Sequence, residues 1–227
     1  MTISAVKNTP PAGTEFFCSW SGGKDSCLAA YRAVQAGCNL SMILTMLNEE
    51  GVRSRSHGLT EDVLRGQSES IGVPIMVTPT TWDGYESAFI ESLNTIGKSD
   101  IKNGVFGDID FIPHLEWEEK VCGEAGMTPY LPLWKVDRRA LLEEFLDAGF
   151  QAMIVTIRSE SLDESYLGRY LDHALIEQFE KIGIDPCGEN GEYHTVVTAG
   201  PLFKEPLSLN TGAIVERAGY LAVDVGL

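Results

Sequence analysis

No apolar run in the 227-residue chain approaches the ~18 consecutive apolar residues that a membrane-spanning helix needs. The segment Met1–Ala12 also lacks the basic start and the apolar centre of a secretory signal peptide. We therefore expect no membrane segment and a cytoplasmic location.

The chain also lacks a cysteine framework. Its five cysteines are Cys18, Cys27, Cys38, Cys122 and Cys187, and no two of them form a C-x-x-C pair. An odd number of widely spaced cysteines indicates neither a set of disulfides nor a zinc or iron–sulfur site. We expect small core residues, and only Cys187, on a polar loop, leaves a chemical role open.

Basic residues are scarce. The chain has 17 Lys and Arg against 33 Asp and Glu, which gives a net charge of −16. Nucleic-acid backbones bind to clustered Lys and Arg, so this balance argues against a nucleic-acid partner. The short runs 53–55 and 135–139 are the only candidates for a local basic patch.

Strand-like apolar runs and helix-like periodic segments alternate through the first half of the chain. The expected strands are Glu15–Ser19, Leu40–Leu47, Val73–Thr78 and Gly104–Gly107, separated by helices over Lys24–Ala36, around Val63–Ile71 and over Tyr85–Ile96. This alternation predicts an α/β fold with a parallel sheet.

The proline-rich stretch Pro129–Trp134 is interpreted as a domain boundary, with domains at residues 13–130 and 131–227. The second part is expected to be a smaller α/β domain. Its predicted elements are a helix after Asp137, a strand at Gln151–Ile157, a helix around Leu171–Ile182, and strands at Tyr193–Thr198, Ala213–Arg217 and Tyr220–Val225.

The hexapeptide Ser21–Ser26, with sequence S-G-G-K-D-S, lies between the first strand and the first helix. Two glycines allow a tight turn and a close approach to an anion, and the N–H groups of the helix start would point at it. Lys24 adds a positive charge, and Asp25 suits a bridging Mg²⁺. An ordinary strand-to-helix turn is the plainer alternative, but six specific residues in succession favour an anion site.

Two further loops follow predicted strands, at Asn48–Gly58 and Gly107–Asp108. Ligands of open parallel sheets bind at the carboxyl ends of the strands, so we expect both loops to face the same crevice as the hexapeptide. His57 in the first of these loops is interpreted as a binding residue.

A second polar constellation lies at Asp185–Thr195 and contains Glu189, Glu192 and His194. On a strand, Glu192 and His194 would project to the same side. A solvated turn before a strand explains the same residues, and the two interpretations stay open at this level.

Three motifs together resemble the diphthine–ammonia ligase-like family of PP-loop (N-type) ATP pyrophosphatases: S-G-G-K-D-S at 21–26, P-L-W-K-V-D at 132–137 and G-E-N-G-E-Y-H-T at 188–195. The first lacks the Walker A spacing, so a P-loop NTPase is not implied. The resemblance extends from about Phe16 to about Phe203. It implies a Rossmann-like nucleotide domain, similar to the adenine nucleotide alpha hydrolases, and a C-terminal acceptor-binding domain.

The resemblance also implies a reaction that uses ATP and Mg²⁺. A ligase of this kind adenylates an acceptor carboxylate, here diphthine on elongation factor 2, and transfers ammonia with release of AMP and pyrophosphate. The implied catalytic residues are Lys24, Asp25, Glu189, Glu192 and His194. The implied nucleotide-binding residues are Ser21, Gly22, Gly23, Lys24, Asp25, Ser26, Leu44, Met46, His57, Gly107 and Asp108, with Asp25 and Asp108 as magnesium ligands.

The acceptor stays open, because Asn190 and His194 stand where diphthine-specific members more often have glycine and an acid. One alternative is the same chemistry on a small-molecule acid such as a corrinoid precursor. Another is a non-catalytic module that senses a nucleotide. A homodimer is neither indicated nor excluded.

Overall fold

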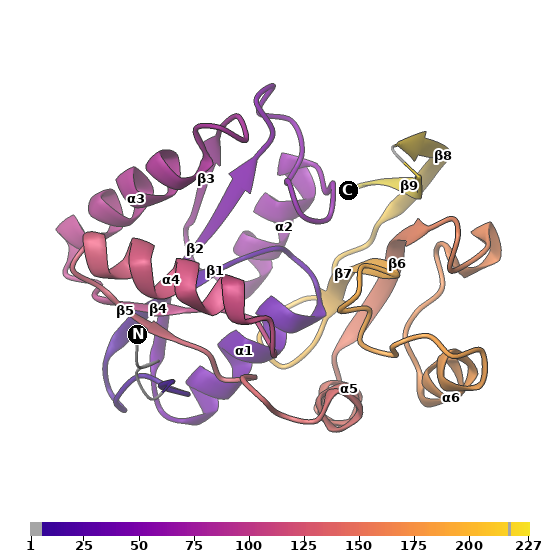
Figure 1. Ribbon diagram of the computed structural model, residues 1–227, viewed down its shortest axis with the longest axis horizontal. Helices are drawn as coiled ribbons and strands as arrows, with labels where there is room; N and C mark the ends of the chain where they lie inside the picture. The colour runs from indigo at the N-terminus through magenta and orange to yellow at the C-terminus, as the bar shows by residue number, and fades with distance from the viewer. Residues whose placement is uncertain (1–5, 218) are drawn as a thin grey trace. The chain divides into compact units, whose positions relative to one another are not determined.

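The computed structural model describes residues 6–217 and 219–227, so residues 1–5 of the Met1–Ala12 segment lie outside the described part. The chain divides into two compact units. The first contains the chain up to Ser21 with residues 25–55 and 73–136, and the second contains residues 22–24, 56–72 and 137–227. Figure 1 shows the course of the chain through both.

The first unit is built on a five-stranded parallel sheet in the order β3-β2-β1-β4-β5. Its strands are β1 (Glu15–Ser19), β2 (Asn39–Leu47), β3 (Ile75–Pro79), β4 (Asn103–Val105) and β5 (Thr128–Tyr130). The strand order reverses beside β1, as it does in doubly wound nucleotide-binding folds. The predicted Rossmann-like parallel sheet is confirmed.

Helices cover both faces of this sheet. They are α1 (Lys24–Gln35), α3 (Tyr85–Ile96) and α4 (Ile112–Glu124), with a 3₁₀ turn at Gly97–Ser99. Helices α3 and α4 lie side by side and share a buried cluster with Phe17 of β1 and Leu44 of β2 (Figure 1). The next residue of β1, Cys18, points to the other face, where it lies close to Cys27 of α1.

Two elements of this unit go beyond the sequence prediction. Helix α4 buries Glu118 among its apolar residues, and a buried acid obscures the apolar periodicity that would reveal the helix. Strand β5 takes up Pro129 and Tyr130, the first residues of the expected linker. Pro129 is tolerated there because β5 lies at the edge of the sheet, where one side needs no N–H donor.

The second unit contains a four-stranded antiparallel sheet in the order β7-β6-β9-β8. Its elements are α2 (Glu61–Ile71), α5 (Arg138–Asp147), β6 (Gln151–Arg158), a 3₁₀ turn (Glu164–Tyr166), α6 (His173–Lys181), β7 (Tyr193–Ala199), β8 (Asn210–Arg217) and β9 (Tyr220–Gly226). The helix predicted after Asp137 is confirmed, and Asp137 caps it, because its Oδ1 accepts a hydrogen bond from the N–H of Ala140 at 3.0 Å.

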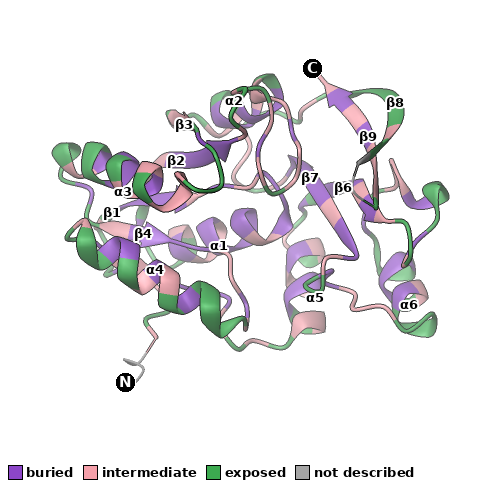
Figure 2. Cartoon of the chain, turned by 45° about the horizontal axis from the view of Figure 1, so that its top comes forward, coloured by how far each residue is buried: buried purple, intermediate pink, exposed green. Residues whose placement is uncertain are grey.

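The two ends of this sheet differ in burial. Strand β7 is buried almost throughout although it stands at the sheet edge, whereas the hairpin strand β8 is largely exposed (Figure 2). Something other than a neighbouring strand must therefore cover the outer edge of β7.

Across residues 6–217 and 219–227, no helix combines the length and the apolar character that crossing a membrane requires.

Candidate active site

The hexapeptide Ser21–Ser26 has the predicted strand–turn–helix setting, because β1 ends at Ser19 and α1 begins at Lys24. Gly22 has a φ of 81°, in the left-handed region that favours glycine. A Cβ at Gly22 would also lie 2.7 Å from Leu59 Cδ1, which is closer than real Cβ atoms approach. Conformation and packing both require glycine at this position.

Within the first unit, four predicted residues lie together. The hydroxyls of Ser21 and Ser26 are 3.1 Å apart, across the start of α1. Gly107 follows β4, and a Cβ on it would lie 2.9 Å from both the carbonyl carbon of Asp25 and the nitrogen of Ser26. The main chain after β4 is thus in contact with the first turn of α1, as expected at the carboxyl ends of adjacent parallel strands.

Asp108 is held in its charged form. Its Oδ1 is 2.6 Å from His114 Nδ1, and Glu118 donates a second hydrogen bond to it. Burial works against the charge, but these two bonds outweigh it, and the pKa of Asp108 lies below its ordinary value. Burial next to this carboxylate raises the pKa of Glu118 well above its ordinary range, so Glu118 carries the shared proton.

Leu44 and Met46 lie inside the parallel sheet. The carbonyl of Leu44 accepts from the N–H of Trp20 at 2.8 Å, and that of Met46 accepts from the N–H of Arg55 at 3.1 Å. Both carbonyls therefore already take part in main-chain bonding. Their contact with adenine stays a prediction.

In the second unit, residues Gly22–Lys24 cover the edge of β7. The N–H of Val197 donates to the carbonyl of Gly22 at 2.9 Å. The N–H of Lys24 donates to Thr195 Oγ1 at 3.2 Å. Residues Gly22–Lys24 thus supply the partners that a further strand would supply, which explains why an edge strand can be buried.

The ring of His57 lies directly against Gly23. A Cβ on Gly23 would overlap the His57 ring, so the ring and the loop need glycine there. Nδ1 of His57 is 2.7 Å from the carbonyl oxygen of Thr195. A carbonyl can only accept, so Nδ1 carries the hydrogen. Burial lowers the pKa of His57 to about 4, helped by the charge of Lys24 and opposed by the bond to Thr195, so the ring is neutral at pH 7.

The side chain of Lys24 is 5% exposed. Its Nζ lies 5.6 Å from the centre of the Tyr193 ring, a distance at which an ammonium is attracted to an aromatic face. Tyr193 belongs to the G-E-N-G-E-Y-H-T motif. Both ends of the Lys24 residue, its N–H and its ammonium, therefore contact the strand of the second motif.

The loop before β7 is a closed turn rather than an open polar segment. Asp185 accepts main-chain hydrogen bonds from Cys187 and Glu189, each at 3.0 Å, and forms an ion pair with Arg138. Cys187 is buried, and its thiol lies 3.0 Å from the carbonyl of Arg138. This placement gives Cys187 a packing role in the turn.

Glu192 and His194 have different surroundings. Glu192 is 7% exposed, and its carboxylate accepts from both the N–H and the side-chain amide of Asn190 at 3.1 Å. The His194 ring lies 4.7 Å from the His57 ring and 6.4 Å from the Tyr220 ring, measured between centres. His194 is therefore the predicted acceptor residue that adjoins His57, which itself lies against Gly23.

Sequence reasoning missed Arg158 and Tyr220 beside this motif. Arg158 Nη2 donates to the carbonyl of Asn190 and to the Tyr220 hydroxyl, and the Arg158 N–H donates to the carbonyl of Glu192 at 2.8 Å. A Cβ on Gly191 would lie 2.6 Å from Nη2, so this glycine makes room for the guanidinium. The contact between Arg158 and Tyr220 comes from the pairing of β6 with β9, for which the sequence has no local signal.

Thr195 and Gln67 were also missed as site residues. In the sequence, Thr195 is the last residue of the G-E-N-G-E-Y-H-T motif, and Gln67 is one position on the face of a predicted helix. The useful signal is the alternation along β7, because Tyr193, Thr195 and Val197 share one direction and all three contact Gly22 or Lys24.

The predicted residues therefore separate by unit. Those of the first unit are Ser21, Asp25, Ser26, Leu44, Met46, Gly107 and Asp108, and those of the second are Gly22, Gly23, Lys24, His57, Glu189, Glu192 and His194. The chain passes from one unit to the other within the hexapeptide itself.

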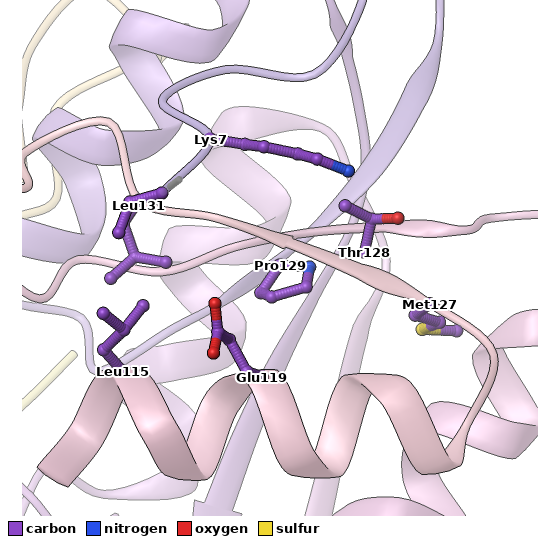
Figure 3. A pocket seen from close by; sticks show the side chains of 8 residues that line it. Lys7, Leu115, Glu119, Met127, Thr128, Pro129 and Leu131 are labelled. Atoms are coloured by element: carbon purple, nitrogen blue, oxygen red, sulfur yellow. The ribbon is translucent and has the colours of Figure 1, made fainter. Parts of the chain in front are cut away.

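A cavity of about 340 Å³ lies elsewhere in the first unit (Figure 3). It lies between α4 and β5, and its lining includes Lys7, Leu115, Glu119 and Leu131. No residue of the candidate site lines it, so this cavity is separate from the candidate site.

Two protein-family models match the chain. The diphthamide synthase N-terminal domain matches residues 16–129, and the diphthamide synthase C-terminal domain matches residues 137–225.

Curated proteins named diphthine–ammonia ligase are similar to the chain. The protein of Bos taurus is 26% identical over 226 residues, which cover 87% of this chain and 84% of that protein. The protein of Danio rerio is 26% identical over 235 residues, covering 91% and 90%. The human protein is 36% identical over 101 residues, which cover 43% of this chain and only 38% of the human protein.

Proposed function

The chain belongs to the diphthamide synthase family, and from that premise we propose that it is an ATP-dependent, AMP-forming ligase. It adenylates an acceptor carboxylate, diphthine on elongation factor 2, and transfers ammonia to it. The observation that carries this proposal is the edge of β7, where the strand of the second motif binds Gly22–Lys24 and His57. One strand thus joins a phosphate-type loop to the candidate acceptor residues.

The chemistry has two steps. A carboxylate oxygen of the acceptor attacks the α-phosphorus of ATP, and pyrophosphate leaves with its bonding electrons. The nitrogen of ammonia then attacks the acyl carbon, AMP leaves, and one proton is lost to form the neutral amide. Neither step needs a covalent enzyme intermediate, so positioning and charge stabilisation are what the protein must supply.

For the first step, we assign the phosphates to the hexapeptide. Lys24 and the main chain of Gly22–Lys24 would hold the pyrophosphate as it leaves, with the hydroxyls of Ser21 and Ser26 as further donors. His57, neutral and fixed by Thr195, would contact the nucleotide from the side of Gly23. Leu44 and Met46 are assigned to the adenine.

Asp25 and Asp108 are assigned to Mg²⁺. Among the described residues no three His, Cys, Asp or Glu side chains form a ready metal cluster. The assignment rests on the chemistry of the two carboxylates, because Mg²⁺ commonly takes one or two carboxylates and completes its shell with phosphate oxygens and water. Asp108 is held charged, and Gly107 packs on the main chain of Asp25. When bound, Mg²⁺ would neutralise charge on the phosphates.

For the second step, we assign Glu189, Glu192 and His194 to the acceptor and to ammonia. Glu192 is buried and fixed by Asn190, which suits orientation of a substrate. His194 carries an imidazole, a group that accepts protons near neutral pH, and so suits removal of the proton from nitrogen.

The reaction can be tested with α-labelled ATP, Mg²⁺, ammonium and diphthine-bearing elongation factor 2, with small carboxylic acids in parallel. We expect AMP and pyrophosphate only when an acceptor is present. AMP formation with small acids alone would move the acceptor to the second class, and ADP as product would refute the ligase. Tight nucleotide binding without any product would favour a sensor.

Asp25→Ala is the matched inactive variant for this assay. We expect it to bind no functional Mg²⁺ and to form no AMP. Undiminished AMP formation would refute the role of Asp25. The proposal also includes a cytoplasmic location, which cell fractionation would test, and no nucleic-acid partner. Light scattering would test whether the protein forms a homodimer.

A further inference from the structure

Gln67 of α2 is a fully buried polar residue, 0% exposed, to which the proposed mechanism gives no role. Its Nε2 donates to the carbonyl of Gly22 at 2.9 Å and to the carbonyl of Val197 at 2.7 Å. Both hydrogens of the side-chain amide are thereby used. One amide therefore bridges the nucleotide loop and the edge of β7.

The bridge reinforces a main-chain contact between the same two segments. The carbonyl of Gly22 also accepts the N–H of Val197 at 2.9 Å. A buried amide is tolerated only where its hydrogen-bonding groups are satisfied, so the spacing of the two carbonyls and the length of the glutamine are matched. Asparagine is one methylene shorter, and an ionised glutamate has no hydrogen to donate.

We propose that Gln67 is a positioning residue that sets the register of the nucleotide loop against β7. The inference rests on the proposed function, because His194 of β7 and Glu192, the residue just before that strand, are assigned to the acceptor. With the register fixed, ammonia reaches the acyl adenylate as soon as it forms. With the register loosened, water attacks the acyl carbon instead, AMP leaves, and the acceptor returns as the free acid.

The test compares Gln67→Met with Gln178→Met. Gln178 lies on α6 of the same unit and bonds Tyr166 and Arg169, so its replacement loses similar hydrogen bonds away from the loop. We expect AMP formed per amide to rise from about one to about three or more in Gln67→Met, since small misplacements strongly affect orientation-dependent steps. The ratio stays near one in Gln178→Met. A role confined to stability would lower both products together.

Hydrogen exchange gives a second readout that needs no acceptor. The amide of Val197, bonded to Gly22, is expected to exchange about tenfold faster in Gln67→Met, which corresponds to the loss of one hydrogen bond's contribution. If wild-type protein forms no acceptor-dependent AMP, the proposed function fails, while this exchange rate still decides whether Gln67 holds the loop.

If Gln67→Met does not fold, Gln67→Asn replaces it in both measurements. It keeps the amide but cannot span both carbonyls, so the same rise in the ratio and in the exchange rate is expected. A ratio near one together with wild-type exchange at Val197, in either variant, overturns the inference.

Discussion

Alternate residues along β7 and the turn before it have different partners. Tyr193, Thr195 and Val197 contact Lys24, Gly22 or His57, so they belong with the loop to which we assign the nucleotide. Glu192, just before β7, and His194, between Tyr193 and Thr195, contact Asn190, Tyr220 and the ring of His57. Since neighbouring residues of a strand face opposite ways, a single strand keeps the two sets adjacent and distinct.

The difference between the two sets lies in the kind of group they use. The set assigned to the nucleotide makes its contacts through main-chain N–H and C=O groups, one hydroxyl and one ring face. The acceptor set works through a carboxylate and an imidazole. Changes in the first set should therefore affect ATP, and changes in the second should affect the acceptor and ammonia.

The largest effect is expected from Lys24→Met, which removes the ammonium that lies over Tyr193. Loss of a charge that stabilises the leaving pyrophosphate should lower the rate of AMP formation by about 10²- to 10³-fold. Tyr193→Phe keeps the ring and is the control, with little change expected. A Lys24→Met rate within about threefold of wild type would remove Lys24 from catalysis.

Glu192→Gln tests the other set. The substitution keeps the shape and removes the charge, so acceptor-dependent turnover should fall about 10²-fold, as for a lost acid–base or orienting group. Binding of a non-hydrolysable ATP analogue, measured by calorimetry, should not change. Weaker binding of the analogue would instead place Glu192 on the nucleotide side.

His57 contacts both sets, and its pKa makes stability depend on pH. Its folded-state pKa of about 4 lies below the usual value of 6.5, so stability is full above pH 6.5 and is lost as pH falls toward 4. The loss should be on the order of 3 kcal/mol.

His57→Asn can still donate to Thr195 but cannot titrate. Urea unfolding at pH 7, 5 and 4 should show a shallower loss of stability in the variant than in wild type. Parallel pH curves for the two proteins would mean that His57 does not carry this dependence.

The smallest effect is expected from Thr195→Val, which removes the hydroxyl that accepts from Lys24 N–H. One such hydrogen bond contributes about 1 kcal/mol, so affinity for the ATP analogue should weaken roughly fivefold. Thr195→Ser keeps the hydroxyl and should bind as wild type does. Equal affinities in all three proteins would show that the bond to Lys24 does not shape the nucleotide loop.

Much of the fold could be predicted because it depends on local patterns. The turn at Ser21–Ser26, the parallel strands and the cap at Asp137 each have a short sequence signal, and each is confirmed. Helix α4 and strand β5 had weaker signals, since one buries Glu118 and the other contains Pro129.

The contacts of the site were harder to predict. The sequence singled out Glu192 and His194 because their side chains are chemically conspicuous. It did not single out Val197, whose N–H and carbonyl bind Gly22 and Gln67, because every residue has those groups. Likewise, the proton shared by Asp108 and Glu118 depends on long-range packing, which no local pattern encodes.

The placement of Gly22–Lys24 on the edge of β7 has a consequence outside catalysis. An uncovered edge strand exposes N–H and C=O groups to which another chain can add, a common route to aggregation. In this protein the loop assigned to phosphate occupies those positions on the strand. Variants that release the loop should therefore lose solubility as well as turnover, and the glycines to which we assign the phosphates also protect the sheet against self-association.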